Sequence, residues 1–161
     1  MVVIRDLVAE DEPALYELFC SIAEEGWIST EPPVARSRTL RMVADHLDPA
    51  VQIHCFTAEL DGRFVGYLGL FDERRKGVAA MGMMLPEHAR SRGVGSALMD
   101  EAIDRARAWG CHRMTLGVWP HNERALGLYR KMGFVEEGRR PAHARRANGE
   151  LWDLIEMGRA L

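Results

Sequence analysis

The chain has 161 residues, of which 47% are hydrophobic and 28% are charged, and its formal net charge is −3 at pH 7. This length and composition predict one domain over residues 1–161 and exclude collagen-like, coiled-coil and disordered classes. The weakly acidic balance favours neither nucleic acid nor a membrane as a partner. Since no apolar run approaches the roughly 18 residues of a membrane span, we expect a soluble, cytoplasmic protein.

The three cysteines, Cys20, Cys55 and Cys111, are far apart and form no C-x-x-C pair, which is typical of reduced thiols. Cys55 and Cys111 lie in or beside apolar strands without a local histidine, so we expect inert core thiols and not a covalent acetyl carrier. No His, Cys and Asp cluster has the spacing of metal ligands, so we expect no metal.

The first part of the chain predicts a strand and two helices. Val2–Ile4 is a short apolar run typical of a strand. Pro13 suits the first turn of a helix that ends at Gly26. The apolar stripe of this helix consists of Leu15, Leu18, Phe19, Ile22 and Ala23. A second, weaker helix is predicted before Pro49. Its apolar positions are Leu40, Val43, Ala44 and Leu47.

The hydrophobic period then changes to two, which predicts three antiparallel strands. Residues 51–57 alternate, an Asp-Gly pair at 61–62 favours a hairpin turn, and residues 64–71 resume the pattern. A second turn over 72–77 leads to a strand at 78–85. Both faces of these strands carry apolar side chains, so we expect helices to cover both faces of the sheet.

The second half alternates helices with strands. We expect a helix over 93–109, a strand over 113–119, a helix over 122–132, and two last strands near 134–137 and 151–157. This succession predicts an α/β fold with a mixed sheet.

Two glycines, Gly93 and Gly95, begin the long helix directly after an apolar strand and a short loop. The first turn of a helix carries free N–H groups and a partial positive charge, so this segment suits a phosphate group. A dinucleotide fingerprint needs a third glycine where Leu98 stands, and a P-loop needs a lysine that is absent. Taken alone, the glycines fit equally well a tight turn without a ligand.

Two motifs in register carry a family resemblance. Residues 90–95, R-S-R-G-V-G, resemble the Q/R-x-x-G-x-G/A signature of the GNAT superfamily of N-acetyltransferases. Residues 118–134, V-W-P-H-N-E-R-A-L-G-L-Y-R-K-M-G-F, resemble the family's second hallmark, in which an Asn opens a helix, a Tyr lies on it and Gly-Phe closes it. The resemblance covers nearly the whole chain. It implies a single-domain GNAT fold, with a mixed, mostly antiparallel, twisted sheet of about six to seven strands and about four helices.

The resemblance also implies acetyl-CoA as cosubstrate. The backbone of residues 83–85 would bind the pantetheine arm, while the methionine side chains fill the core. The amides of residues 91–96 would hold the pyrophosphate, with Arg90 or Arg92 adding charge. Asn122 would contact the cofactor, cap its helix, or do both. The implied cofactor-binding residues are Met83, Met84, Leu85, Arg90, Ser91, Arg92, Gly93, Val94, Gly95, Ser96 and Asn122.

Tyr129 matches the family's usual general acid, which protonates the thiolate of coenzyme A as it leaves. A phenol of pKa near 10 that protonates a thiolate of pKa near 8.5 works uphill by roughly 2 kcal/mol. Because Tyr129 also lies on the apolar stripe of its helix, a purely structural role in the core fits the same position.

The general base is open at this stage. Several relatives carry a glutamate on the fourth strand, but residues 78–85 contain no ionisable side chain. The alternatives are a water chain or one of the side chains Glu24, Glu25, Glu31 and His121. At pH 7 the free energy needed to remove a proton is roughly 4.6 kcal/mol for a lysine-like amine and roughly 1.4 kcal/mol for an α-amino group.

The resemblance implies that the segment with Glu25, Trp27 and Glu31 helps to line the acceptor groove, and carboxylates beside an aromatic ring suit a cationic amine. We favour a small amine or amino acid as acceptor and keep a peptide N-terminus as an alternative. The alternative function is a non-catalytic acyl-CoA sensor.

By resemblance alone, we expect a homodimer formed through the last strands. The basic segment 138–146 is interpreted as a solvated turn between these strands. The alternatives for this segment are contact with an acidic protein or with the cofactor's ribose phosphate.

Overall fold

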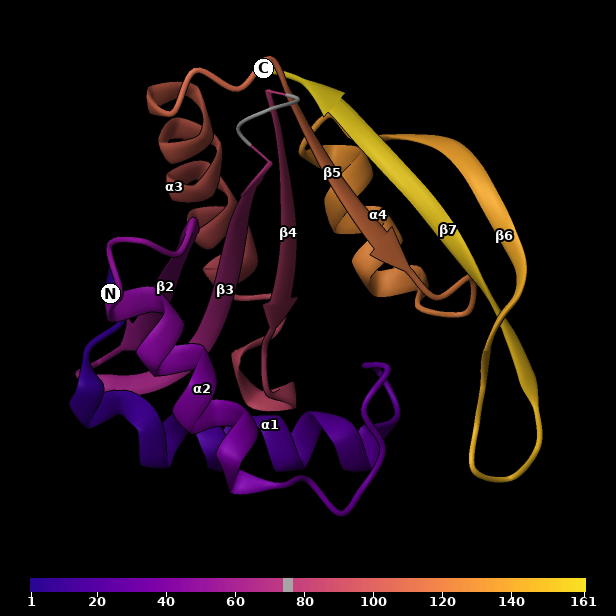
Figure 1. The fold of residues 1–161 in the computed structure, drawn as a ribbon, viewed down its shortest axis with the longest axis horizontal. Coiled ribbons are helices and arrows are strands. Elements are labelled where there is room, and N and C mark those ends of the chain that lie inside the picture. The colour runs from indigo at the N-terminus through magenta and orange to yellow at the C-terminus, as the bar shows by residue number, and fades with distance from the viewer. Residues whose placement is uncertain (74–76) are drawn as a thin grey trace.

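The computed structural model describes residues 1–73 and 77–161, which form one seven-stranded sheet and four α-helices (Figure 1). The strands are β1 (Val2–Asp6), β2 (Ile53–Leu60), β3 (Arg63–Glu73), β4 (Val78–Met84), β5 (Arg113–Val118), β6 (Val135–Arg145) and β7 (Leu151–Ala160). The helices are α1 (Glu12–Glu25), α2 (Arg36–Leu47), α3 (Val94–Ala108) and α4 (Glu123–Lys131). Short 3-10 turns lie at Ala9–Asp11 and Glu87–Ala89.

The order of strands in the sheet is β1-β2-β3-β4-β5-β7-β6. Neighbouring strands are antiparallel except β4 and β5, which are parallel. The expected mixed, mostly antiparallel sheet is therefore confirmed. Within the described ranges, no helix has the length and apolar character needed to cross a membrane.

Helices cover both faces of the sheet, as the apolar residues on both faces of the strands predicted. Helices α1 and α2 lie on one face, and α3 and α4 lie on the other (Figure 1). One apolar cluster joins α3 and α4 to the sheet through buried residues such as Leu68, Leu98 and Met114. The second cluster joins α1 and α2 to the sheet and includes Leu15 and Tyr67.

The parallel pair β4 and β5 separates along its length. Cα partners exist only where 78–80 faces 113–115. Beyond this point the two strands diverge, as Figure 1 shows, while β5 continues to pair with β7 on its other side. Among the described residues, the edge of β4 at 81–84 that faces away from β3 thus has no partner strand, and its backbone N–H and C=O groups remain available to another molecule.

The hairpin predicted at 61–62 is confirmed: Asp61 and Gly62 connect β2 and β3 with φ angles of 52° and 76°. The turn predicted over 72–77 is described only at its ends, because residues 74–76 lie outside the described residues.

Helix α2 exists, but of its four predicted apolar positions only Val43 is buried. Leu40 and Leu47 are 53% and 54% exposed, whereas Thr39 and Val43 are buried. The hydroxyl of Thr39 donates to Glu12 Oε1 at 2.7 Å, so this polar residue is buried with its hydrogen bond made. Apolar spacing alone therefore predicts a face that is largely rotated away from the sheet.

The last hairpin also differs from the prediction, because β6 continues to Arg145 and the segment 138–145 is not a solvated turn. Arg139 pairs with Asp153 at 2.9 Å and Arg140 with Glu156 at 2.6 Å, both across β6 and β7. Most side chains of this edge strand are exposed. No alternation of apolar and polar residues was therefore available to indicate a strand.

His46 links α2 to β2 in a way that predicts a pH-dependent stability. Its Nδ1 accepts from the N–H of Cys55 at 3.1 Å, so its Nε2 carries the proton and donates to Leu7 O at 3.0 Å. Desolvation, followed by the nearby His54, lowers the pKa of His46 below 6.5. Its neutral form is favoured only in the folded state, so its contribution to stability is present above about pH 6.5 and is lost as pH falls towards the lower pKa.

We expect the urea midpoint of the wild-type protein to fall between pH 7.5 and pH 5.5, and to fall less in His46→Gln. The exposed His88→Gln variant is the control, and its pH dependence should follow the wild type. An equal change of the urea midpoint between these two pH values in all three proteins would show that His46 is not responsible for the pH dependence of stability.

Candidate active site

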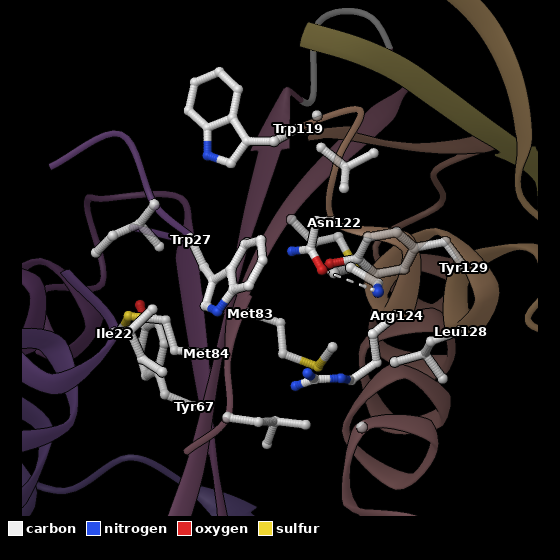
Figure 2. A pocket seen from close by; sticks show the side chains of 18 of the residues that line it. Ile22, Trp27, Tyr67, Met83, Met84, Trp119, Asn122, Arg124, Leu128 and Tyr129 are labelled. Carbon is white, nitrogen blue, oxygen red and sulfur yellow. Dashed lines mark hydrogen bonds between the residues drawn. The ribbon is translucent and has the colours of Figure 1, made fainter. Parts of the chain in front are cut away.

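A cavity of about 750 Å³ opens where β4 and β5 diverge. Figure 2 shows that its walls come from distant parts of the chain, with Ile22 and Trp27 on one side and Leu128 and Tyr129 on the other. Met83, on β4, lies between them. The cavity thus joins the free edge of β4 to both helical layers.

The glycine loop forms one end of this cavity. Gly93 precedes α3 with φ +81°, and a Cβ there would meet nothing within 4 Å, so the space in front of the helix is open. A Cβ on Gly95 would lie 2.8 Å from Leu128 Cδ2, so a glycine allows the first turn of α3 to approach α4 closely. Ser91 also has a positive φ, of 58°. The loop therefore leaves room for a ligand at the amides that begin α3.

Most of the predicted cofactor residues line this cavity. They are Met83, Met84, Leu85, Arg90, Ser91, Gly93, Gly95, Ser96 and Asn122. Two do not. Val94 is fully buried in the core, and Arg92 is exposed outside the lining. Of the two arginines proposed to add charge, the structure places Arg90 at the cavity.

Arg90 connects the two sides of the cavity. Its Nε donates to Leu85 O at 3.0 Å, and its guanidinium makes a two-point contact with Glu25, at 2.7 and 2.9 Å. The C-terminal end of β4 is thereby tied to the end of α1. Because a carboxylate already balances it, Arg90 adds less positive charge to the cavity than a free arginine would.

Asn122 both caps α4 and lines the cavity. Its Oδ1 accepts from the N–H of Ala125 at 3.2 Å, which is the usual bond of an N-cap residue. Figure 2 shows the side chain beside Tyr129. The side-chain NH2 of Asn122 therefore remains available at the cavity while the side-chain oxygen stabilises the helix.

Tyr129 is buried on α4, with 7% of its surface exposed, and its hydroxyl points into the cavity beside Asn122 (Figure 2). Desolvation raises the pKa of Tyr129 to about 12. The hydroxyl makes no hydrogen bond to another described residue. The side chain is therefore a neutral proton donor facing the cavity.

Of the three residues expected in the acceptor groove, only Trp27 lines the cavity. Glu25 is paired with Arg90 and also accepts from Trp27 Nε1 at 3.1 Å. Glu31 accepts from the N–H of Ala147 at 2.8 Å. The two glutamates thus hold other parts of the protein together, and this placement differs from the expectation that their carboxylates face a cationic amine.

The loop after α1 is anchored by the tip of the β6–β7 hairpin. The buried Arg146 donates to Ile28 O at 3.1 Å and to Ser29 O at 3.3 Å, and its guanidinium lies 4.2 Å from the centroid of the Trp152 ring. Ile28 and Ser29 both line the cavity. The hairpin therefore fixes the wall of the cavity nearest to Trp27.

No aspartate or glutamate lines the cavity among the described residues. Of the proposed bases, His121 is packed between the rings of Trp27 and Trp152, at centroid distances of 5.6 and 4.6 Å, and lies outside the lining. The cavity can thus donate a proton through Tyr129, but it presents no carboxylate that could remove one directly.

Several cavity residues were missed by the sequence predictions, notably Arg38, Trp119 and three residues of α4. Arg124, Leu128 and Lys131 follow the helical spacing of four and three, so one face of α4 points into the cavity. The sequence prediction for this helix concerned its apolar stripe, which includes Leu128, and gave Arg124 and Lys131 no role.

The cysteines are placed as predicted. Cys55 and Cys111 are buried. Desolvation raises the pKa of the Cys55 thiol to about 11, and its sulfur lies 3.2 Å from the Tyr67 hydroxyl. A thiol in this environment is a poor nucleophile at neutral pH.

Comparison with known proteins assigns the chain to a family. The model of the acetyltransferase (GNAT) family matches residues 12–134. The chain therefore belongs to the GNAT acetyltransferase family, and the resemblance of its two motifs is confirmed.

Among curated proteins, the chain is similar to the L-amino acid N-acetyltransferase AaaT of Escherichia coli strain K12. The two are 38% identical over 104 residues, which cover 62% of this chain and 64% of that relative. The match thus spans less than two thirds of the relative's length.

Solved structures share the fold over nearly the whole chain. A GCN5-related N-acetyltransferase from Kribbella flavida is 26% identical with a TM-score of 0.85, covering 99% of this chain and 98% of that one. A GNAT phosphinothricin acetyltransferase from Sinorhizobium meliloti, solved with AcCoA, is 23% identical with a TM-score of 0.84, covering 99% of this chain and 88% of that one.

Proposed function

We propose that this protein transfers the acetyl group of acetyl-CoA directly to a primary amine, with a small amine or an amino acid as the favoured acceptor. The observation that carries the proposal is the cavity between the diverging strands β4 and β5, which brings the glycine loop and the Tyr129 hydroxyl to one space. The names of AaaT and of the phosphinothricin acetyltransferase support an acceptor of amino-acid type.

The cosubstrate fits the chemistry of this space. The pyrophosphate would accept hydrogen bonds from the amides that begin α3, with Arg124 and Lys131 supplying positive charge from α4. The amide groups of the pantetheine arm would pair with the free backbone edge of β4 at 81–84. Such pairing extends the sheet by one strand, a common way of binding an extended ligand.

In the reaction, the neutral amine nitrogen attacks the thioester carbonyl carbon and a C–N bond forms. The C–S bond then breaks, the sulfur receives the proton of the Tyr129 hydroxyl, and the proton of the new ammonium group leaves to water. Water later restores the proton of Tyr129. Atoms and charge therefore balance without any further reactant.

The elevated pKa of Tyr129, about 12, makes full proton transfer to a thiolate of pKa near 8.5 uphill by about 5 kcal/mol. The burial that raises the pKa of Tyr129 also raises the pKa of a thiol held in the cavity. The difference between the two pKa values is therefore smaller than it is for a thiol in water. A hydrogen bond from Tyr129 to the sulfur, with the proton transferred as the C–S bond breaks, avoids the cost of a complete proton transfer to a free thiolate.

The missing carboxylate favours an acceptor that loses its proton easily. At pH 7 the α-amino group of a peptide, of pKa near 8, needs roughly 1.4 kcal/mol to lose its proton, against roughly 4.6 kcal/mol for a lysine-like amine. The α-amino group of a free amino acid lies between the two, because its own carboxylate raises its pKa. A cavity whose described lining holds no acidic side chain suits an α-amino group better than a lysine-like amine.

The test is release of coenzyme A thiol from acetyl-CoA with pooled amino acids, polyamines, aminoglycosides or short peptides. We expect the amino-acid pool to exceed the rate without amine by at least about tenfold. A rate that no pool raises, with acetyl-CoA still increasing the melting temperature, would support the sensor function and contradict the proposal.

A cytoplasmic homodimer remains part of the proposal. The last two strands carry exposed apolar side chains, with Val135 and Leu151 exposed by 61% and 53%. Such surface on the final hairpin is what pairing through the last strands would bury.

A further inference from the structure

Among the described residues, the end of the cavity beneath α1 and α2 is lined by apolar side chains, by Tyr67 and by one cation. Its walls come from both helices and from β3 and β4, and its apolar members are Phe19, Ile22, Met42, Phe71 and Met81. Among the described residues, the one charged side chain that these four elements contribute to the lining is Arg38, on α2. We call this part of the cavity the α1–α2 end.

Arg38 has no carboxylate partner among the described residues, unlike its neighbours. Arg36 pairs with Glu12 at 2.7 Å, and Arg90 pairs with Glu25 at 2.7 Å. The exposed side chain of Arg38 instead places its guanidinium 5.2 Å from the centroid of the Phe19 ring, and both residues line the cavity. Its hydrogen-bond donors are therefore available to a ligand.

The charge of the whole lining favours an anionic group at this end. The described lining contains three arginines, one lysine and one histidine, His143, but no acidic side chain. Arg124 and Lys131 lie on α4, on the cofactor side, and Arg90 is balanced by Glu25. These cations make the electrostatic potential of the cavity positive. It repels the additional positive charges of a polyamine or an aminoglycoside and attracts a carboxylate.

We propose that Arg38 binds the carboxylate of the acceptor, and that the acceptors are α-amino acids with apolar side chains. This inference rests on the proposed acetyl transfer and specifies its substrate class. The guanidinium holds the carboxylate by paired hydrogen bonds, and the apolar residues of the α1–α2 end surround the side chain.

The same contact assists the chemistry. A nearby carboxylate stabilises the ammonium form of an amine, so it raises the pKa of the amino group. When Arg38 neutralises that carboxylate, the pKa of the amine falls and more of it is in the reactive, neutral form. Removal of Arg38 should therefore move the rising limb of the pH–rate profile for an amino acid to higher pH.

The test compares leucine with leucinamide, in which a neutral amide replaces the carboxylate. Because this change also lowers the pKa of the amine, each KM is expressed as the concentration of unprotonated amine. In the wild type we expect a KM for leucine at least about tenfold below that for leucinamide. Arg38→Ala should raise the KM for leucine about 10- to 100-fold, with the KM for leucinamide and for acetyl-CoA changed by less than about twofold. Arg38→Lys should recover part of the loss.

The matched control is Arg41→Ala, which removes an exposed arginine from the same helix outside the cavity lining. It should leave all three KM values unchanged. Equal KM values of wild type for leucine and leucinamide, or an equal loss for both in Arg38→Ala, would overturn the role of Arg38 while leaving acetyl transfer intact.

A binding measurement separates this inference from the proposed function. In the presence of coenzyme A, N-acetyl-leucine should raise the melting temperature of the wild type more than N-acetyl-leucinamide does, and Arg38→Ala should lose this difference. If no amine is acetylated at all, the proposed function fails, and this comparison still decides whether Arg38 recognises a carboxylate.

Discussion

Replacing Tyr129 with phenylalanine should lower kcat about 100-fold and leave the KM for acetyl-CoA within about twofold. The hydroxyl faces the cavity and is not held by a hydrogen bond to any described residue, while the ring packs in the core 6.2 Å from that of Phe134. The substitution therefore removes the proton donor and keeps the packing. Steady-state kinetics together with a melting curve make the comparison.

The matched control is Tyr16→Phe, which removes a hydroxyl that donates to Val34 O at 3.1 Å, outside the cavity lining. It should retain the wild-type kcat. Because the pKa of Tyr129 is raised to about 12, the wild-type kcat should show no loss of the general acid up to about pH 10. An unchanged kcat in Tyr129→Phe would remove Tyr129 from the proposed mechanism.

Replacing Ser96 with glutamate should raise the KM for acetyl-CoA about 30- to 100-fold. Ser96 lies in the first turn of α3 and lines the cavity at the glycine loop. A carboxylate there occupies the free amides and repels the pyrophosphate, although it stabilises the empty helix by about 0.3–1 kcal/mol. We therefore expect a melting temperature without ligand equal to or above that of the wild type.

The uncharged Ser96→Gln variant separates the effect of the added charge on the KM from the effect of the larger side chain. It should raise the KM for acetyl-CoA by less than about fivefold. A Ser96→Glu protein that binds acetyl-CoA as tightly as the wild type would place the pyrophosphate elsewhere and contradict the proposed position of the cofactor.

Most of the fold could be predicted because its signals are local. The Asp-Gly hairpin at 61–62 and the alternation of helices and strands after Gly93 depend on residues close together in the sequence. The extension of β6 to Arg145 could not be predicted, because its stability comes from ion pairs with β7 and from an edge position that leaves both faces polar.

The residues of the candidate site also differ in whether a local pattern or a long-range contact determines their role. The glycine loop and Tyr129 were found because each lies in a short motif. The placement of Glu25 depends on Arg90, which lies 65 residues away in the chain, and that of Glu31 depends on the hairpin tip at Ala147. Such long-range pairs have no local signature, so a carboxylate expected at the acceptor groove was found to have a structural partner instead.

Arg38 illustrates the opposite case, in which a residue without a motif gains its role from the tertiary structure. On the sequence it is one of several charged residues at the start of α2. Only the packing of α2 beside α1 brings it to the cavity that also contains Tyr129. Functional residues outside a family's motifs are of this kind when the acceptor, unlike the cofactor, varies among relatives.

The most direct test of the account follows an isotopically labelled acetyl group from acetyl-CoA to leucine by mass spectrometry. The account predicts labelled N-acetyl-leucine, formed in proportion to the amount of enzyme and nearly abolished in Tyr129→Phe. Labelled product that forms equally well with the Tyr129→Phe protein, or no labelled product with any amine while acetyl-CoA still binds, would contradict it.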